Sequence, residues 1–427
     1  MPLTVQKYGG TSVGSPERIR AVARRIVRAR RAGSAMVVVV SAMGDSTDDL
    51  LRLAREVTGG DRAALDHPRE MDMLLTAGER ISMALLAMAI CAEGEGAVSM
   101  TGSQAAIITD EVHTAARITE VRADRVREAL AQGNVVIVAG FQGVSRTREV
   151  TTLGRGGSDT TAVALAAALR ADRCEIFTDV PGVYTADPRK VRGARVIPEI
   201  SYPEMLELAA GGAQVMHPRA IEIASRFGVD VWVGSSFDDS PEARGTLITR
   251  TPSRMEDLVL TGITAQSGQA KLLIRDFAAG MGSVTAVLVA LAEAGVSVDM
   301  IAEAAEPGGG TQLQLTVSEA QRTDAEAVVR RVLDGLGGGE IEGSGGLSRI
   351  ALVGSGMHQR PGVYARAFRT LLEQQVEVSA VSTSGISITL WVPADREEAA
   401  VAALHEAFSL ELAGPVAGIG DSAPGAR

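Results

Sequence analysis

Short strand-like runs recur along the first half of the chain, and small residues follow each of them. The runs are Leu3–Tyr8, Met36–Ser41, Val135–Ala139 and Cys174–Thr178. Amphipathic helical patterns separate them, at 16–31, 48–56, 69–93 and 158–170, and Ser15 and Pro16 are suited to start the first helix. Repeated β-α units with largely apolar strands predict an α/β fold, a mainly parallel sheet sandwiched by helices.

The composition narrows the functional classes. The 427 residues carry 42 Lys and Arg against 52 Asp and Glu, a net charge of −10, and only 3% are aromatic. Nucleic-acid binders normally have a basic excess or aromatic stacking platforms, so we expect no nucleic-acid partner. The two cysteines, Cys91 and Cys174, exclude a disulfide scaffold and a cysteine-based zinc site. Without a signal-peptide pattern or an uncharged apolar run of about 18 residues, we expect a cytoplasmic protein with no membrane partner.

A polar stretch at 237–252 predicts a domain boundary. Beyond it the chain repeats itself at a spacing of 80 residues, as in Gly282 and Gly362 or Val296 and Val376. Each copy reads as a glycine, an amphipathic helix and an apolar strand, which fits two ferredoxin-like βαββαβ modules. We interpret the glycine-rich stretch 335–346 as a flexible connector between them.

These patterns divide the chain into four parts. A first α/β domain covers residues 1–250, and the two modules cover 258–336 and 347–412. Residues 413–427, rich in Gly, Ala and Pro, are expected to form a frayed tail.

Familiar nucleotide signatures are missing, because the sequence has neither a P-loop nor a G-x-G-x-x-G run. Small-residue turns instead follow the predicted strands, where open α/β sheets bind ligands. Lys7 with Gly9 and Gly10 offers a cation and backbone N–H groups to a polyphosphate. A tight turn with a solvated lysine is the alternative interpretation of the same residues. Ser41 and Thr47 follow the second strand and could bind a carboxylate or phosphate, or form a turn and a helix cap.

Two further stretches offer charges of opposite sign. Glu79 lies in a long helical pattern and could bind a substrate ammonium, the alternative being an exposed helix charge or an ion pair. The stretch 151–161, T-T-L-G-R-G-G-S-D-T-T, leads directly into an Ala-rich helix. Glycines, hydroxyls and an arginine at a helix N-terminus favour an anion site, and Arg155 could bind a carboxylate bidentately. We expect Ser158 to cap that helix.

The last turn runs from Thr178 to Arg189 and reads T-D-V-P-G-V-Y-T-A-D-P-R. Acid, aromatic and basic side chains in one loop can hold a nucleotide. A surface loop is an equal alternative on these grounds.

Taken in order, these stretches resemble one family over essentially the whole chain. The motifs are K-Y-G-G-T-S, V-V-S-A-M-G, L-L-T-A-G-E-R-I-S, F-Q-G-V, T-T-L-G-R-G-G-S-D-T-T-A, T-D-V-P-G-V-Y-T-A-D-P-R and M-H-P-R-A-I-E. They look like those of aspartate kinases in the amino-acid kinase superfamily, and the paired modules look like that family's two ACT domains. The resemblance implies the amino-acid kinase fold followed by two ACT modules.

The resemblance also implies a reaction, in which ATP and L-aspartate give ADP and 4-phospho-L-aspartate with Mg²⁺. Lys7 would act with Asp159 as the catalytic pair, Asp159 orienting Lys7 or the metal shell. Arg155 would hold the α-carboxylate of aspartate and Glu79 its ammonium. The other substrate-pocket residues implied are Ser41, Thr47, Gly156, Gly157 and Ser158. The nucleotide-binding residues implied are Lys7, Gly9, Gly10, Thr178, Asp179, Tyr184, Asp187 and Arg189.

A carboxylate nucleophile is already ionised at neutral pH, so such a kinase needs positioning and charge neutralisation rather than a general base. Two alternatives stay open: a kinase for a related acidic amino acid, and a regulatory chain that pairs through its ACT modules. We expect a homo-oligomer held by those modules, and an internal start at Met255 would yield a separate regulatory subunit.

The sequence departs from the family pattern at several places. Gln214 stands where many members have a nucleotide-side lysine. In the first module, the family's D-K-P-G turn is replaced by Ala278–Gly282, and its Gln-Asn pair by Glu303-Ala304. The polar residues that face an effector amino acid are thus largely lost. We therefore expect weakened feedback inhibition, in lysine, threonine and methionine synthesis or in a specialised pathway.

Overall fold

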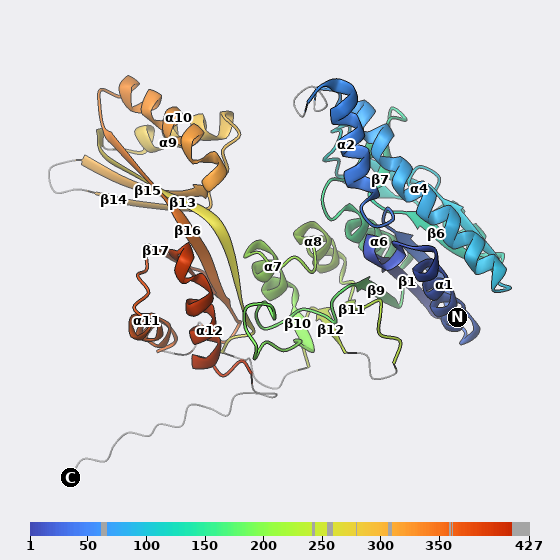
Figure 1. Ribbon diagram of the computed structural model, residues 1–427. Coiled ribbons are helices and arrows are strands. Elements are labelled where there is room, and N and C mark those ends of the chain that lie inside the picture. Colours follow the sequence, from blue (N-terminus) through green and yellow to red (C-terminus); the bar gives the residue numbers. More distant parts are fainter. Residues whose placement is uncertain are drawn as a thin grey trace, which may run out of the picture. The chain divides into compact units, whose positions relative to one another are not determined.

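The computed structural model describes residues 1–60, 66–240, 244–253, 259–278, 280–305, 310–357, 360 and 362–411. The chain forms two compact units, Met1–Tyr184 with Val196–Met255, and Thr185–Arg195 with Glu256–Arg427 (Figure 1). Sequence analysis placed all of 1–250 in one domain, whereas the contacts group Thr185–Arg195 with the second unit. The expected tail 413–427 and Met255 lie outside the described residues.

An eight-stranded sheet forms the centre of the first unit, in the order β10-β12-β11-β9-β1-β2-β6-β3. Its neighbouring strands are parallel except β11 and β12, which confirms the predicted mainly parallel sheet. The strands are β1 (Leu3–Tyr8), β2 (Ala35–Val40), β3 (Ala97–Met100), β6 (Val135–Ala139), β9 (Arg173–Thr178), β10 (Glu199–Ser201), β11 (Val231–Ser235) and β12 (Gly245–Thr249).

Helices cover both faces of this sheet because its central strands are apolar on both sides. Along β2, Met36, Val38 and Val40 pack with α1 (Pro16–Arg31) and α4 (Pro68–Ala92). Val37 and Val39 point to the opposite face and are equally buried. There α6 (Gly157–Leu169) contacts β1 and β2, and α8 (Pro218–Phe227) contacts α6 and α7 (Tyr202–Ala210). As predicted, Ser15 caps α1, its hydroxyl accepting from the Arg18 N–H at 3.3 Å.

Four short strands form a second sheet in this unit, in the order β5-β4-β7-β8. They are β4 (Ile107–Thr109), β5 (Ile118–Val121), β7 (Gln142–Ser145) and β8 (Val150–Thr152). The 3-10 turn η1 (Gly10–Val13) and the helices α2 (Ser46–Thr58) and α5 (Asp124–Ala131) complete the unit. Because β7 follows β6 and β8 precedes α6, the small sheet positions the loop that enters α6.

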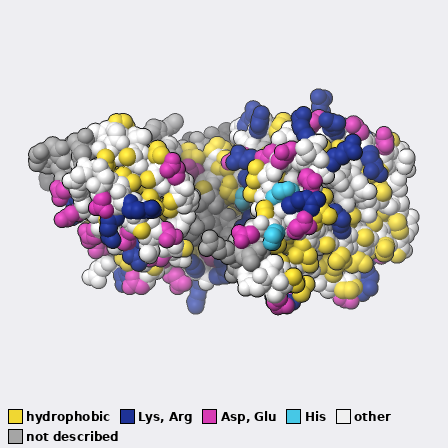
Figure 2. Space-filling model, turned by 90° about the horizontal axis from the view of Figure 1, so that it is seen from above, with side chains coloured by type: hydrophobic (Ala, Val, Ile, Leu, Met, Phe, Trp, Pro, Cys, Tyr) yellow, Lys and Arg dark blue, Asp and Glu magenta, His cyan; other side chains and the backbone are white. Residues whose placement is uncertain are grey.

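Among the described helices, α4 alone is long and apolar enough to cross a membrane. It is nevertheless a core helix of the first unit, because Leu86 and Ile90 are fully buried against the sheet and α1. It also buries two carboxylates, Asp72 and Glu79. Hydrophobic side chains gather on part of this unit's surface, and charges of both signs are spread over the rest of the visible face (Figure 2).

The second unit contains one six-stranded antiparallel sheet rather than two separate ones, in the order β14-β15-β13-β16-β18-β17. Its elements are β13 (Gly262–Ala278), α9 (Met281–Glu293), β14 (Met300–Ala305), β15 (Gly310–Ser318), η2 (Glu319–Gln321), α10 (Arg322–Gly335), β16 (Glu340–Val353), α11 (Val363–Glu373), β17 (Ala380–Thr383), β18 (Ser387–Pro393), η4 (Ala394–Arg396) and α12 (Glu397–Ala407). The long strands β13 and β16 serve both modules. Ile263 and Ile350 lie in the core with α11 and α12, whereas Leu272 lies in the core with α9 and α10.

The predicted flexible connector is wrong from Glu340 onward, because that part belongs to β16. Its glycines make room for acidic side chains. A Cβ at Gly343 would lie 1.9 Å from Glu326 Oε1, and one at Gly345 would lie 2.2 Å from Glu319 Oε2. Gly343 and Gly345 therefore lie within a strand beside acidic side chains, which composition alone does not distinguish from flexibility.

Candidate active site

The parallel register brings the predicted turns to one edge of the large sheet. Tyr8 at the end of β1 pairs with Val40 at the end of β2 and with Phe177 near the end of β9. Val40 in turn pairs with Ala139 at the end of β6. The turns after these four strands therefore lie beside one another, at the edge where parallel α/β sheets bind ligands.

The first two turns contact each other directly. The Gly44 N–H donates to the Gly10 carbonyl at 3.1 Å, and a Cβ at Gly10 would lie 2.9 Å from the Ala42 carbonyl oxygen. The Gly9 N–H donates to the Phe177 carbonyl at 3.2 Å, so it is engaged within the protein. Gly10 thus matters through its small size, which lets the two turns meet, whereas a Cβ at Gly9 would make only ordinary contacts, 3.7 Å from Lys7 Nζ.

Lys7 and Asp159 form an ion pair with 2.6 Å between Nζ and Oδ1, and the two side chains are only 12% and 11% exposed. Asp159 lies in the first turn of α6. The pair therefore holds Lys7 at the N-terminus of α6, which is the positive end of the helix dipole. Both the lysine and this helix end favour an anionic ligand. Both residues were expected at the site from the sequence motifs, and the fold brings them together from positions far apart in the chain.

The structure corrects the predicted cap of α6. The helix begins at Gly157 with Gly156 as its N-cap, so Ser158 lies inside the first turn rather than capping it. Gly156 has a φ of +67°, and a Cβ there would lie 2.1 Å from the Cβ of His217. The close approach of His217 thus requires a glycine at the cap. Ser158 is buried and lies against Gly140, where a Cβ would come 2.7 Å from its Oγ.

Arg155 lies just before this helix and is exposed. Within the described part of the chain, its guanidinium takes part in no hydrogen bond or ion pair. Ser41 and Thr47 are half-buried on the turn after β2 and at the start of α2. These three side chains are therefore accessible to a small molecule.

Glu79 is buried rather than exposed, only 3% of it being accessible. Its Oε1 accepts from the Ala42 N–H at 3.2 Å, while its Oε2 has no hydrogen-bond partner among the residues that the structure describes. Gly78 allows this approach, because a Cβ there would lie 2.7 Å from the Ala42 Cβ. Burial raises the pKa of Glu79 from its ordinary value of 4.5 to about 7. A buried carboxylate with an unpaired oxygen favours a cationic ligand.

The predicted nucleotide loop is divided between the two units. Thr178 Oγ1 donates to Asp179 Oδ1 at 3.0 Å at the end of β9, and Tyr184 forms an isolated bridge with Val196. These residues belong to the first unit.

Asp187 and Arg189 belong to the segment that packs in the second unit. They pair with each other at 2.8 Å, and Arg189 lowers the pKa of Asp187. Two contacts to α12 hold this segment. Lys190 pairs with the buried Glu397 at 2.5 Å, and Thr185 Oγ1 lies 2.9 Å from His405 Nε2.

Two residues of the M-H-P-R stretch, His217 and Arg219, have structural roles that the sequence did not predict. His217 caps α8, its Nδ1 accepting from the Arg219 N–H at 3.3 Å, and burial lowers its pKa. Arg219 donates to the carbonyls of Leu153 and Ala116 at 2.5 and 2.7 Å. The sequence signal was a polar residue before a proline that opens a helix. It predicts a cap but not the contact with the loop before α6.

The family comparisons agree with this fold. The amino acid kinase family model matches residues 2–235, and an ACT domain model matches residues 350–408. The chain is thus a member of the amino acid kinase family with a C-terminal ACT domain.

Curated relatives narrow the class. The aspartokinase of Geobacillus stearothermophilus is 46% identical over 412 residues, which cover 96% of this chain and 98% of the relative. That of Mycolicibacterium smegmatis is 46% identical over 415 residues, covering 96% and 97%. Among solved structures, E. coli aspartokinase III in complex with aspartate and ADP superposes with a TM-score of 0.77 at 27% identity, covering 95% of this chain and 99% of that one. The chain belongs to the aspartokinase family.

The buried Glu79 leads to a pH-dependent stability prediction. Because its pKa in the folded protein is about 7 against an ordinary 4.5, folding favours the protonated form. The carboxyl therefore destabilises the fold increasingly as the pH rises from 4.5 through 7. At pH 8 we expect Glu79→Gln to raise the free energy of unfolding of the ligand-free protein by something on the order of 3 kcal/mol. The gain should shrink steadily toward pH 5.

Thermal or urea unfolding at the two pH values measures this effect. Glu70→Gln, an exposed glutamate on the same helix, is the matched control and should show no such pH dependence. An equal effect of Glu79→Gln at both pH values would contradict the assigned cause.

Proposed function

We propose that the chain transfers the γ-phosphoryl group of ATP to the side-chain carboxylate of L-aspartate, giving ADP and 4-phospho-L-aspartate. The observation that carries the proposal is the buried Lys7–Asp159 pair at the N-terminus of α6, beside the turns that meet at the sheet edge. Family membership supports it, and E. coli aspartokinase III has been solved with aspartate and ADP.

Charge neutralisation is the main task of this site. The aspartate carboxylate attacks the γ-phosphorus and the bond to the ADP oxygen breaks, so two anions must approach each other. Lys7 neutralises the transferring group, and the N–H groups at the start of α6 add partial positive charge. Asp159 holds Lys7 in position through their 2.6 Å contact. No general base is required, because the nucleophile is already ionised.

Two charged residues would recognise the amino-acid part of the substrate. Arg155 is accessible and binds the α-carboxylate, while the free oxygen of Glu79 accepts from the α-ammonium. The ammonium would also favour the ionised form of Glu79 and lower its pKa from about 7. The remaining pocket residues are Ser41, Thr47, Gly156, Gly157 and Ser158.

ATP would lie along the neighbouring turns. The residues assigned to it are Lys7, Gly9, Gly10, Thr178, Asp179, Tyr184, Asp187 and Arg189. No group of three or more His, Cys, Asp or Glu side chains in the described part of the chain could hold a metal ion. Mg²⁺ commonly keeps several waters and binds through substrate phosphates with one or two carboxylates, and this site fits that arrangement, with Asp159 nearby. When bound, Mg²⁺ would neutralise phosphate charge.

A coupled assay of ADP release in the cytoplasmic pH range tests which amino acid is the phosphoryl acceptor. ADP release should be much faster with L-aspartate than with L-glutamate or D-aspartate. ADP release that does not depend on L-aspartate would overturn the proposal, and preference for another acidic amino acid would favour the second candidate, a kinase of a related substrate.

Lys7→Ala and Arg155→Ala should impair the reaction in different ways. Lys7 stabilises charge on the transferring group, so its loss should lower kcat by about 100-fold or more. Arg155 binds the ground-state α-carboxylate, so its loss should mainly raise the KM for aspartate. Steady-state kinetics with both substrates varied measures the difference. Arg80→Ala, an exposed arginine beside Glu79 on α4, is the control, and equal small effects of the first two changes would contradict the roles.

We propose that the chain forms a homo-oligomer through its ACT modules. The six-stranded sheet ends in β14 and β17, and Ile301 and Val381 on these edge strands are 53% and 45% exposed. An open apolar edge favours pairing with another chain. Light scattering at micromolar concentration should give a mass above one chain, reduced by Ile301→Lys with Val381→Lys. A monomeric wild type would count against the proposal.

We also propose weak feedback control by lysine and threonine. Glu303 and Ala304 lie exposed on β14, where an acid and a methyl replace the family's amide pair. An acid repels an effector's carboxylate, and each lost hydrogen bond costs about 1–3 kcal/mol. Millimolar lysine and threonine, added singly and together at the aspartate KM, should leave activity largely unchanged. Strong concerted inhibition would overturn this proposal and leave the kinase assignment intact.

A further inference from the structure

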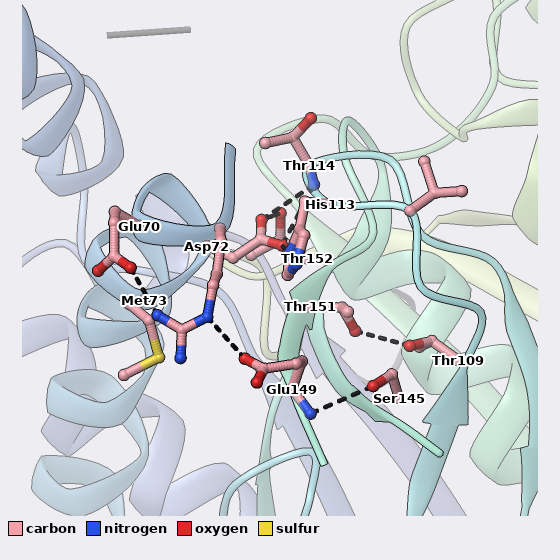
Figure 3. Close-up of polar contacts among 12 residues, drawn as sticks. Glu70, Asp72, Met73, Thr109, His113, Thr114, Ser145, Glu149, Thr151 and Thr152 are labelled. Carbon is pink, nitrogen blue, oxygen red and sulfur yellow. Dashed lines mark hydrogen bonds and ion pairs between the residues drawn. The ribbon is translucent and has the colours of Figure 1, made fainter. Parts of the chain in front are cut away.

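A fully buried carboxylate, Asp72, lies on α4 outside the site described above (Figure 3). Its Oδ2 is 2.6 Å from His113 Nδ1, and its Oδ1 accepts from the Thr152 hydroxyl at 2.5 Å. The Thr114 N–H donates to both oxygens, at 3.0 and 3.2 Å. The Nδ1–H tautomer of His113 donates to this oxygen. Asp72 is thus fully satisfied by groups from two other segments.

Those two segments meet in front of α6. The loop of His113 and Thr114 leads to Ala116, whose N–H donates to the Thr152 carbonyl at 2.9 Å. Gly154 has a φ of +73° and lies so close to the loop that a Cβ there would be 3.0 Å from the Thr114 carbonyl oxygen. Arg219 donates to carbonyls of both segments. Arg155 follows directly, so its position depends on this junction.

The same helix carries Glu79. Asp72 and Glu79 are seven residues apart, which is about two helical turns, so they share one buried face of α4. One end of the face holds the loop before Arg155, and the other presents Glu79. A rigid helix therefore sets the separation between the two residues proposed to bind the carboxylate and the ammonium of the substrate.

We propose that Asp72 and His113 are a positioning pair that fixes Arg155 relative to Glu79, and so sets affinity for the α-amino acid part of the substrate. The proposal rests on the function proposed above. Neither residue touches the reacting atoms. Loss of the pair loosens the segment 151–157 and weakens aspartate binding, while ATP, which is held by other turns, is bound as before.

Three variants test the proposal in the full-length chain. His113→Ala should raise the KM for aspartate about tenfold, the loss expected for one charge-assisted hydrogen bond, with the KM for ATP within about twofold of wild type. His113→Asn retains an N–H near the place of Nδ1 and should restore most of the affinity. His67→Ala, exposed at the N-cap of the same helix, is the control and should behave as wild type.

Amide hydrogen exchange separates this proposal from the proposed function, because it needs no substrate. His113→Ala should speed exchange at 151–157 and leave the rest of α6 protected. Unchanged exchange there, or equal changes in both KM values that Asn does not rescue, would overturn the positioning role. A wild type that does not use L-aspartate would instead overturn the proposed function, and the exchange result would still decide whether the pair holds the loop.

Discussion

The ion pair between Lys7 and Asp159 is the contact on which the geometry of the site depends. It joins the end of the first strand to the first turn of α6 with both side chains mostly buried. Removing one partner of such a pair leaves an uncompensated charge in a poorly solvated place, at a cost of about 3–5 kcal/mol. The pair therefore fixes α6 against the sheet edge, and with it the glycines and Arg155 that precede the helix.

Glu79 differs from the Lys7–Asp159 pair, because it is a buried acid with no oppositely charged partner among the described residues. Its burial raises its pKa to about 7, and one of its oxygens has no partner within the described residues. At neutral pH and above, the ligand-free protein is therefore less stable than it would be with a neutral residue at this position. Groups that wait for a ligand commonly reduce stability in this way. The helix that carries Glu79 is anchored by Asp72, whose oxygens are fully satisfied. One helix thus carries two different carboxylates. The oxygens of Asp72 are hydrogen-bonded within the protein, whereas Glu79 has an oxygen that is available to a ligand.

The second unit is organised by two strands rather than by two independent modules. The strands β13 and β16 each contribute side chains to both cores, so the two modules share one continuous sheet. The segment Thr185–Arg195 packs in this unit, with Ala186 and Val191 in its core. That segment carries Asp187 and Arg189, two of the residues proposed to bind the nucleotide.

Much of this protein was readable from its sequence. Strand and helix periodicity determined the mainly parallel sheet, Ser15-Pro16 determined the start of α1, and the ordered motifs determined the family. Local chemistry is sufficient for these features, because periodicity and capping depend on neighbours in the chain. Gly343 and Gly345, which lie within β16, were misread for the same reason: the acidic side chains of Glu326 and Glu319 lie against them only in the folded chain.

The tertiary structure decided which polar residues matter. Asp72 and Glu79 are both acidic residues of one helical pattern, and nothing local distinguishes them from exposed charges. Their roles follow from burial and from partners brought by distant segments, His113, Thr152 and Ala42. Ser158 is likewise a residue type that commonly caps helices. In the folded chain, however, His217 packs against Gly156, and Gly156 rather than Ser158 is the N-cap of α6. The sequence determined which groups are available, and the fold determined which of them meet. Burial and pairing depend on residues that are distant in the sequence and become neighbours only in the folded chain.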